Sequence, residues 1–311
     1  MVPTDALREK LRGLPARLKE RVVCQDDAID IVVERLQHAE LGLTPPGRPK
    51  ASFLLLGPTG VGKTKLVLEF SREVLGPGKV VRLDMSEYQT QDRIALLLGN
   101  SYAEPGRIAE GHDACGGVGT LLFDEIEKAH PRVLDILLQI LEPARLTTGS
   151  NRVLDFSGWY VAMTSNLGAA RIMAMRRSIY ETMRRLVQQD AQRELRPEIF
   201  ARITEVVVLN RLDYAAQTRI AEGVVAEELL EHRSRGHAMA LERGVSDAVI
   251  NRGYCERLGA RPMRDAAERM VRSALAADLL NGGRGAGRLQ AHSSGTKLEL
   301  LPTATAANTG G

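Results

Sequence analysis

The chain has 311 residues, of which 44% are apolar and 26% charged, so it can fold as one large domain or two ordinary ones around a buried core. The aromatic content of 4% disfavours a stacking platform for single-stranded nucleic acid, and a net charge of +3 is too small to indicate a nucleic-acid or membrane partner. The apolar run Phe53 to Leu56 is far shorter than the ~20 residues of a membrane-spanning helix, and Asp5, Arg8 and Glu9 stand where a secretory signal would be apolar. We therefore expect a soluble cytoplasmic protein.

Residues 1–45 have the apolar periodicity of helices. Leu7, Leu11 and Leu14 recur at intervals of three and four, and the stretch from Ala28 to Ala39 repeats the pattern. The stretch from Thr44 to Pro49, rich in Pro and Gly, then breaks it. The sequence predicts a helical lead-in that ends near residue 45.

Short apolar runs without alternation follow, separated by helix-period segments such as Val133 to Leu141. Such runs are typical of strands buried on both faces of a sheet. They lie at 52–56, 79–83, 120–123, 160–164 and 205–209. Strands that alternate with helices predict an α/β fold, a parallel sheet covered by helices on both faces.

The pattern changes after Leu209, and we place a domain boundary near Leu212. Helix-like segments at 214–233, 246–253 and 261–280, with one edge strand at 297–301, predict a small, mostly helical domain over residues 212–302. The small polar residues 303–311 predict a disordered tail.

A glycine-rich phosphate-binding pattern, G-x-x-x-x-G-K-[ST], follows the first predicted strand and precedes a predicted helix. Its residues are Gly57, Pro58, Thr59, Gly60, Val61, Gly62, Lys63 and Thr64. The glycines let backbone N–H groups surround a phosphate chain at the start of the helix. Lys63 would reach the β- and γ-phosphates and the Thr64 hydroxyl would hold Mg²⁺, so the sequence predicts a nucleoside triphosphate site.

Two carboxylates, Asp124 and Glu125, follow the predicted strand at 120–123. Asp124 suits a Mg²⁺ ligand and Glu125 suits a residue that polarises the attacking water, whereas the alternative is an acidic turn that caps the next helix. Asn166 follows a further strand and could orient the same water, or form an ordinary Asx turn.

Several motifs together resemble the Clp family of AAA+ ATPases, and most of all the second ATPase module of ClpB-type disaggregases. The resemblance runs from about Leu7 to Leu301. Its motifs, in family order, are Val23-Cys-Gln-Asp, the segment 57–64, Arg82-Leu-Asp-Met-Ser-Glu-Tyr, Leu122-Phe-Asp-Glu-Ile-Glu-Lys-Ala-His, Met163-Thr-Ser-Asn-Leu-Gly and Gly259-Ala-Arg-Pro. The resemblance implies a large AAA+ P-loop domain over residues 1–211, followed by a lid domain.

The resemblance also implies a hexameric ring, expected here to be homo-oligomeric, with ATP and Mg²⁺ between neighbouring subunits. By motif, Arg202 matches the arginine finger that enters the neighbour's site, and Arg261 matches the lid arginine that senses the γ-phosphate. The backbone near Val22 and Val23 would line the adenine pocket, and Cys24 replaces the glycine expected there.

Some family features are absent. The Gly-Tyr-Val-Gly loop that grips a threaded polypeptide is missing from a shortened interval, where Tyr102 is the only aromatic residue between Leu98 and Thr120. No Ile-Gly-Phe or Ile-Gly-Leu peptidase-docking tripeptide occurs between Leu167 and Arg196.

These observations predict an ATP-hydrolysing, chaperone-like module that remodels or unfolds a protein partner. One alternative is a dedicated assembly or disassembly ATPase that acts on one partner without threading it. A second alternative is a nucleotide-gated scaffold that does not hydrolyse ATP, which the carboxylates and Asn166 disfavour. The partner itself, and whether a ring contains other subunits, stay open at the level of sequence.

Overall fold

The computed structural model of the chain describes residues 4–100, 104–175 and 179–302. Tyr102 and the tail 303–311 lie outside the described residues. The chain divides into two compact units, Met1–Arg211 and Leu212–Gly311, each of which is described by itself.

A five-stranded parallel sheet forms the centre of the first unit, with the strand order β2-β3-β6-β1-β7. Each strand begins and ends within two residues of an apolar run in the sequence. β1, β3 and β6 are buried at every position, whereas only Leu83 is buried on the edge strand β2. The bounds are β1 Ala51–Leu56, β2 Val80–Asp84, β3 Thr120–Asp124, β6 Tyr160–Ser165 and β7 Glu205–Val208.

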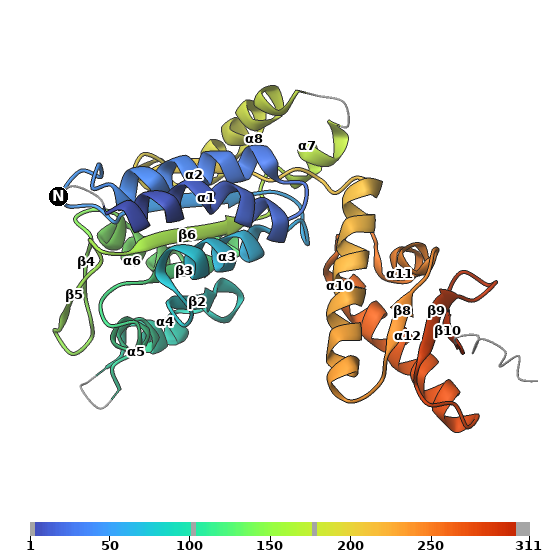
Figure 1. Cartoon of the computed structure of the whole chain (residues 1–311). Coiled ribbons are helices and arrows are strands. Elements are labelled where there is room, and N and C mark those ends of the chain that lie inside the picture. Colours follow the sequence, from blue (N-terminus) through green and yellow to red (C-terminus); the bar gives the residue numbers. More distant parts are fainter. Residues whose placement is uncertain (1–3, 101–103, 176–178, 303–311) are drawn as a thin grey trace, which may run out of the picture. The chain divides into compact units, whose positions relative to one another are not determined.

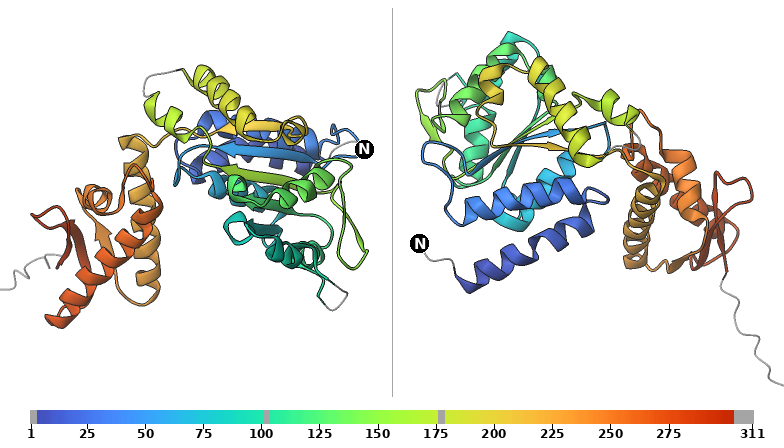
Figure 2. Two further views of the ribbon diagram at one scale, coloured as in Figure 1. Left: turned by 180° about the vertical axis from the view of Figure 1, so that it is seen from behind. Right: turned by 90° about the horizontal axis from the view of Figure 1, so that it is seen from above.

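Helices cover both faces of this sheet (Figures 1 and 2). The lead-in helices α1 (Asp5–Arg21) and α2 (Asp26–Glu40) lie on one face with α3 (Lys63–Leu75), and α6 (Pro131–Leu141) and α8 (Tyr180–Glu194) lie on the other. The predicted apolar stripe of α1 is buried at Leu11 and Leu14. On α3, the ring of Phe70 packs against Phe53 of β1 with 5.6 Å between centroids.

Shorter elements complete the first unit. Helices α4 (Gln91–Leu98) and α5 (Arg107–Ala114) follow the β2 edge strand, with the short helix η1 (Met85–Glu87) between them and the strand. An antiparallel hairpin forms from β4 (Arg145–Thr147) and β5 (Val153–Asp155). The remaining elements are η2 (Ile126–Lys128), α7 (Ala169–Ala174) and α9 (Pro197–Phe200).

The second unit contains α10 (Tyr214–Ser234), α11 (Val245–Gly253) and α12 (Arg261–Leu280), close to the helices that the sequence predicts. The expectation of a single edge strand is wrong. β8 (Met239–Leu241), β9 (Gly287–Ala291) and β10 (Leu298–Leu301) form a three-stranded sheet. β8 is apolar but has only three residues, and β9 mixes Arg288 and Gln290 with apolar residues, so neither resembles the longer buried runs of the first unit.

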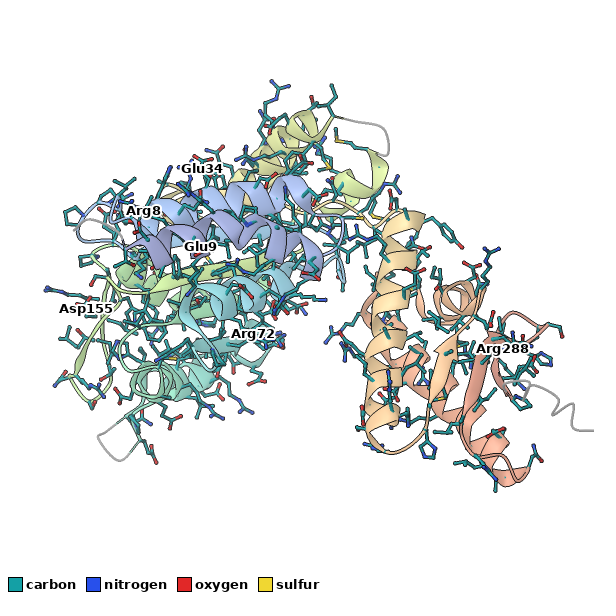
Figure 3. All side chains as sticks on the ribbon, in the orientation of Figure 1. Arg8, Glu9, Glu34, Arg72, Asp155 and Arg288 are labelled. Atoms are coloured by element: carbon teal, nitrogen blue, oxygen red, sulfur yellow. The ribbon has the colours of Figure 1, made fainter. Side chains whose placement is uncertain are left out.

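Charged side chains lie on the outer faces of the elements (Figure 3). Arg8 and Glu9 on α1 and Glu34 on α2 are exposed, as are Asp155 at the end of β5 and Arg288 in the second unit. Within the described residues, none of the helices has the combination of length and hydrophobicity needed to cross a bilayer.

Candidate functional site

The glycine-rich segment 57–64 connects the carboxyl end of β1 to the start of α3, as its sequence predicts. Gly60 and Gly62 have φ values of 74° and 107°, which L side chains rarely adopt. A Cβ atom on Gly57 would lie 3.0 Å from the carbonyl oxygen of Leu209. The loop therefore needs glycine for its backbone path and for its close approach to the end of β7.

The ammonium group of Lys63 lies inside this loop. It donates hydrogen bonds to the carbonyl oxygens of Gly57 at 2.6 Å and Pro58 at 2.8 Å, and to Oδ1 of Asn166 at 2.9 Å. Burial lowers the pKa of Lys63 to about 8, against the opposing effect of nearby carboxylates, first among them Glu127. A buried cation held among oxygen atoms is well placed to meet a polyanion such as a phosphate chain.

Asp124, at the carboxyl end of β3, receives hydrogen bonds from three neighbouring elements. The Thr64 hydroxyl donates to Oδ1 at 3.0 Å, and the Thr164 hydroxyl donates to the same oxygen at 2.5 Å. Arg82 on β2 donates to Oδ2 through Nε at 3.0 Å and a terminal nitrogen at 2.5 Å. The sequence alone assigns no role to Arg82, because its approach to Asp124 depends on the pairing of β2 with β3.

Glu125 follows Asp124 with a left-handed backbone, φ 60° and ψ 53°. Its backbone N–H donates to the Thr164 hydroxyl at 3.0 Å. Its carboxylate lies 2.5 Å from Nζ of Lys128, and this hydrogen bond raises the pKa of Lys128. The Glu125 side chain makes no capping hydrogen bond to the start of η2, so the alternative that this carboxylate caps the next helix has no support at η2.

Asn166, just beyond the carboxyl end of β6, joins the phosphate-binding loop to η2. Its Oδ1 accepts from Lys63 and, at 3.3 Å, from the Thr59 hydroxyl. Its backbone N–H and its Nδ2 both donate to Oε1 of Glu127, at 3.0 and 3.1 Å. The structure thus brings Thr59, Lys63 and Asn166 into contact at one edge of the sheet.

The same edge of the sheet offers the oxygen ligands that Mg²⁺ takes in phosphate sites, a hydroxyl and a carboxylate. Oγ1 of Thr64 and Oδ1 of Asp124 lie 3.0 Å apart, next to the Lys63 cation and the backbone of the glycine loop. This donor set fits a magnesium–triphosphate complex.

The predicted adenine-pocket segment lies against the loop. A Cβ built on Gly62 would lie 3.6 Å from Val22, and Val23 follows Val22 directly. Gln25 is buried, and its side-chain amide donates to the carbonyl oxygens of Val61 at 3.3 Å and Asn210 at 3.0 Å. The sequence alone assigns no role to Gln25, because its hydrogen-bond partners Val61 and Asn210 are distant in sequence.

Arg202 lies at the opposite end of β1 from the phosphate-binding loop. Its carbonyl oxygen accepts a hydrogen bond from the Ser52 hydroxyl at 3.2 Å, and its side chain forms an ion pair with Glu142 at 3.2 Å. Ser52 and Leu56 are separated by about 13 Å along the strand. The structure therefore does not bring Arg202 to the loop of its own chain.

Arg261 is the first residue of α12 in the second unit, and it is exposed. Pro262 stands at the start of the same helix, where its fixed φ suits the first turn. The Gly-Ala-Arg-Pro motif thus ends in the first turn of a long helix.

The interval between α4 and α5 is closed at its base by backbone contacts. The N–H of Asn100 donates to the carbonyl oxygen of Glu104 at 3.1 Å, and the N–H of Gly149, in the β4–β5 connection, donates to the carbonyl oxygen of Leu98 at 3.0 Å. A Cβ on Gly149 would lie 1.9 Å from the carbonyl oxygen of Gly99. The two loops therefore pack backbone against backbone.

Family comparisons match both units. Residues 48–206 match the AAA domain (Cdc48 subfamily), and residues 212–288 match the C-terminal, D2-small domain of ClpB protein. The chain is 39% identical over 288 residues to chaperone protein ClpB of Meiothermus ruber, which covers 88% of this chain and 33% of that protein. It is 38% identical over 269 residues to heat shock protein 100 of Trypanosoma brucei brucei, covering 83% of this chain and 30% of the relative.

Solved structures of Hsp104 are similar as well. The Saccharomyces cerevisiae Hsp104–ADP complex superimposes with a TM-score of 0.84 at 31% identity, over 96% of this chain and 54% of that one. A closed state of Hsp104 with ATPγS and fluorescein-labelled casein gives 0.84 at 30% identity, over 96% and 53%. The chain spans about a third of the length of the curated relatives and about half of these structures.

Proposed function

Because the chain belongs to the AAA domain family and carries the small domain of the ClpB D2 module, we propose that it binds and hydrolyses ATP and remodels a protein partner with the energy released. The observation that carries the proposal is the hydrogen-bonded cluster of Lys63, Thr64, Asp124 and Asn166 at one edge of the sheet. The relatives named as chaperones support the remodelling role, and the cytoplasm is the compartment that the sequence predicts.

In this proposal the chain's own residues hold and polarise the triphosphate. Loop N–H groups and the start of α3 bind the phosphates, and the Lys63 ammonium moves from loop carbonyls to phosphate oxygens. Thr64 and Asp124 would hold Mg²⁺, and the ion would supply positive charge to neutralise the phosphates. Without the ion, Arg82 donates hydrogen bonds to the same Asp124 carboxylate.

The Glu125 carboxylate accepts a hydrogen bond from the attacking water and polarises it, while Asn166 orients the same water. Glu125 leaves its ion pair with Lys128 to do so. Val22 and Val23 form a wall of the adenine pocket beside Gly62.

We propose that Arg202 acts on the site of a neighbouring subunit, since it lies at the far end of β1 from its own loop. A homohexameric ring supplies that neighbour at every interface, with residues 212–302 as the lid domain that carries Arg261 toward the γ-phosphate. The match of residues 212–288 to the D2-small domain of ClpB supports a separate lid domain.

Two substitutions test hydrolysis. Lys63→Ala should abolish ATP binding in a fluorescence or calorimetric titration, because the cation that meets the phosphates is gone. Glu125→Gln should bind ATP with unchanged affinity and stop turnover, because only the water loses its polarising carboxylate. Wild-type turnover in Glu125→Gln would contradict the role of that carboxylate, and a wild-type protein that binds ATP without turnover would favour the nucleotide-gated scaffold.

A second candidate is a dedicated assembly or disassembly ATPase that acts on one partner without threading it. The closed base of the shortened loop favours it, since Asn100 and Glu104 are joined across only three intervening residues. A grip on a sliding polypeptide needs an aromatic side chain that projects from this loop. Tyr102, the residue that could supply it, lies outside the described residues.

A further inference from the structure

The carboxylate of Glu127 contacts Asn166 at two points. Oε1 of Glu127 accepts from the backbone N–H of Asn166 at 3.0 Å and from its side-chain Nδ2 at 3.1 Å. Glu127 comes from η2, after β3, and Asn166 follows β6, so the contact bridges neighbouring strands of the sheet.

These two bonds determine which end of the Asn166 amide faces the phosphate-binding loop. Nδ2 is the donor end and is engaged by the carboxylate, which has no hydrogen to offer in return. Oδ1 therefore points the other way, where it accepts from Lys63 at 2.9 Å and Thr59 at 3.3 Å. An acceptor, and not a donor, therefore faces Lys63 and Thr59 of the phosphate-binding loop.

We propose that Glu127 is the positioning residue that holds Asn166 with Oδ1 toward the attacking water. The inference rests on the proposed ATPase function and adds a residue to it. When phosphate oxygens take over the hydrogen bonds of Lys63 and Thr59, Oδ1 is left free to accept one hydrogen of the water. Glu125 accepts the other, so the water presents a lone pair to phosphorus.

Glu127 is exposed, so its removal leaves no cavity in the core and the fold should tolerate the change. Glu127→Ala should lower kcat by about 10- to 100-fold, on the scale of a misplaced reacting group. Its dissociation constant for ATP should stay within about twofold of wild type, because the loop and Lys63 are intact. Glu127→Gln keeps an acceptor oxygen and should retain most of the rate. Glu34→Ala, an exposed glutamate on α2, is the matched control.

A reciprocal exchange gives a sharper test. Asn166→Asp alone places a carboxylate against Glu127 and should lose the pairing by repulsion. Adding Glu127→Gln restores a donor–acceptor pair with the same total charge and again leaves an oxygen toward the loop. The double variant should recover kcat by about tenfold over Asn166→Asp, a coupling typical of residues in direct contact.

A spectroscopic readout separates the orientation from activity. The side-chain amide resonance of Asn166, identified by its loss in Asn166→Ala, should shift in Glu127→Ala and stay near its wild-type position in Glu127→Gln. An unchanged resonance together with wild-type kcat in Glu127→Ala would overturn the inference, as would an effect confined to the dissociation constant. A wild-type protein without ATPase activity would instead overturn the proposed function, while the resonance would still report on the positioning.

Discussion

At the scale of single residues, backbone strain occurs at the candidate nucleotide site and at the β4–β5 hairpin, where Ala144 and Asn151 have φ values of 63° and 60°. Among the described non-glycine residues with positive φ, Glu125 at 60° carries the proposed water-polarising carboxylate, and Cys24 at 56° follows the adenine-pocket segment. Such conformations cost of the order of 1–3 kcal/mol each and persist where the surroundings enforce them. The hydrogen bond of the Glu125 N–H to Thr164 and the hydrogen bonds of the buried Gln25 side chain are suited to enforce them.

Replacing Cys24 by glycine should stabilise the protein. Glycine adopts this φ without the clash of a Cβ, and the gain exceeds its larger backbone entropy in the unfolded chain, so we expect about 0.5–1 kcal/mol. The check is the free energy of unfolding from a denaturant titration. Cys255→Gly is the control, because Cys255 is exposed and does not have a positive φ, and it should be neutral or destabilising. A stability loss in Cys24→Gly would show that the thiol contributes more than the strain costs.

Element by element, the sequence predicts the buried strands best. β1, β3 and β6 are buried at every position and each contains an apolar run, so their ends could be placed within a residue or two. The hairpin strands β4 and β5 were missed, because each has three residues and only the central one is buried.

The part of the candidate site that depends on contacts between elements could not be predicted from the sequence. Lys63, Thr64 and Asp124 belong to motifs with a known chemical pattern, and their proximity follows from the order of strands in a parallel sheet. Glu127 and Arg82 are charged residues near those motifs, and nothing in their spacing states which neighbour they bind. Their hydrogen bonds to Asn166 and Asp124 depend on the pairing of β3 with β6 and with β2.

The geometry of the loop between α4 and α5 leads to a prediction for the ATPase rate in the presence of unfolded polypeptide. Because the loop is closed at Asn100 and Glu104 and lies against the β4–β5 connection, casein should not raise the steady-state ATPase rate. The measurement is the rate with and without saturating casein, in wild type and in Tyr102→Ala. Stimulation that disappears in Tyr102→Ala would show that Tyr102 grips the substrate and would favour threading.

At the scale of the whole molecule, the role that we propose for Arg202 would make assembly a requirement for catalysis. The phosphate-binding loop and Arg202 lie at opposite ends of β1, so under this proposal one subunit cannot complete its own site. Interfaces of this head-to-tail kind close into rings when the rotation between subunits allows it. We therefore propose a ring with one ATP at each interface.

Mixing two inactive variants tests this central claim most directly. Arg202→Ala should bind ATP but lose hydrolysis by about 10³-fold, and Lys63→Ala should bind no ATP. In rings formed from equal amounts of both, about a quarter of the interfaces pair an intact Lys63 with an intact Arg202 from the neighbour, so the steady-state ATPase rate should recover accordingly. No recovery on mixing, together with a wild-type rate proportional to concentration down to the monomer range, would contradict catalysis between subunits.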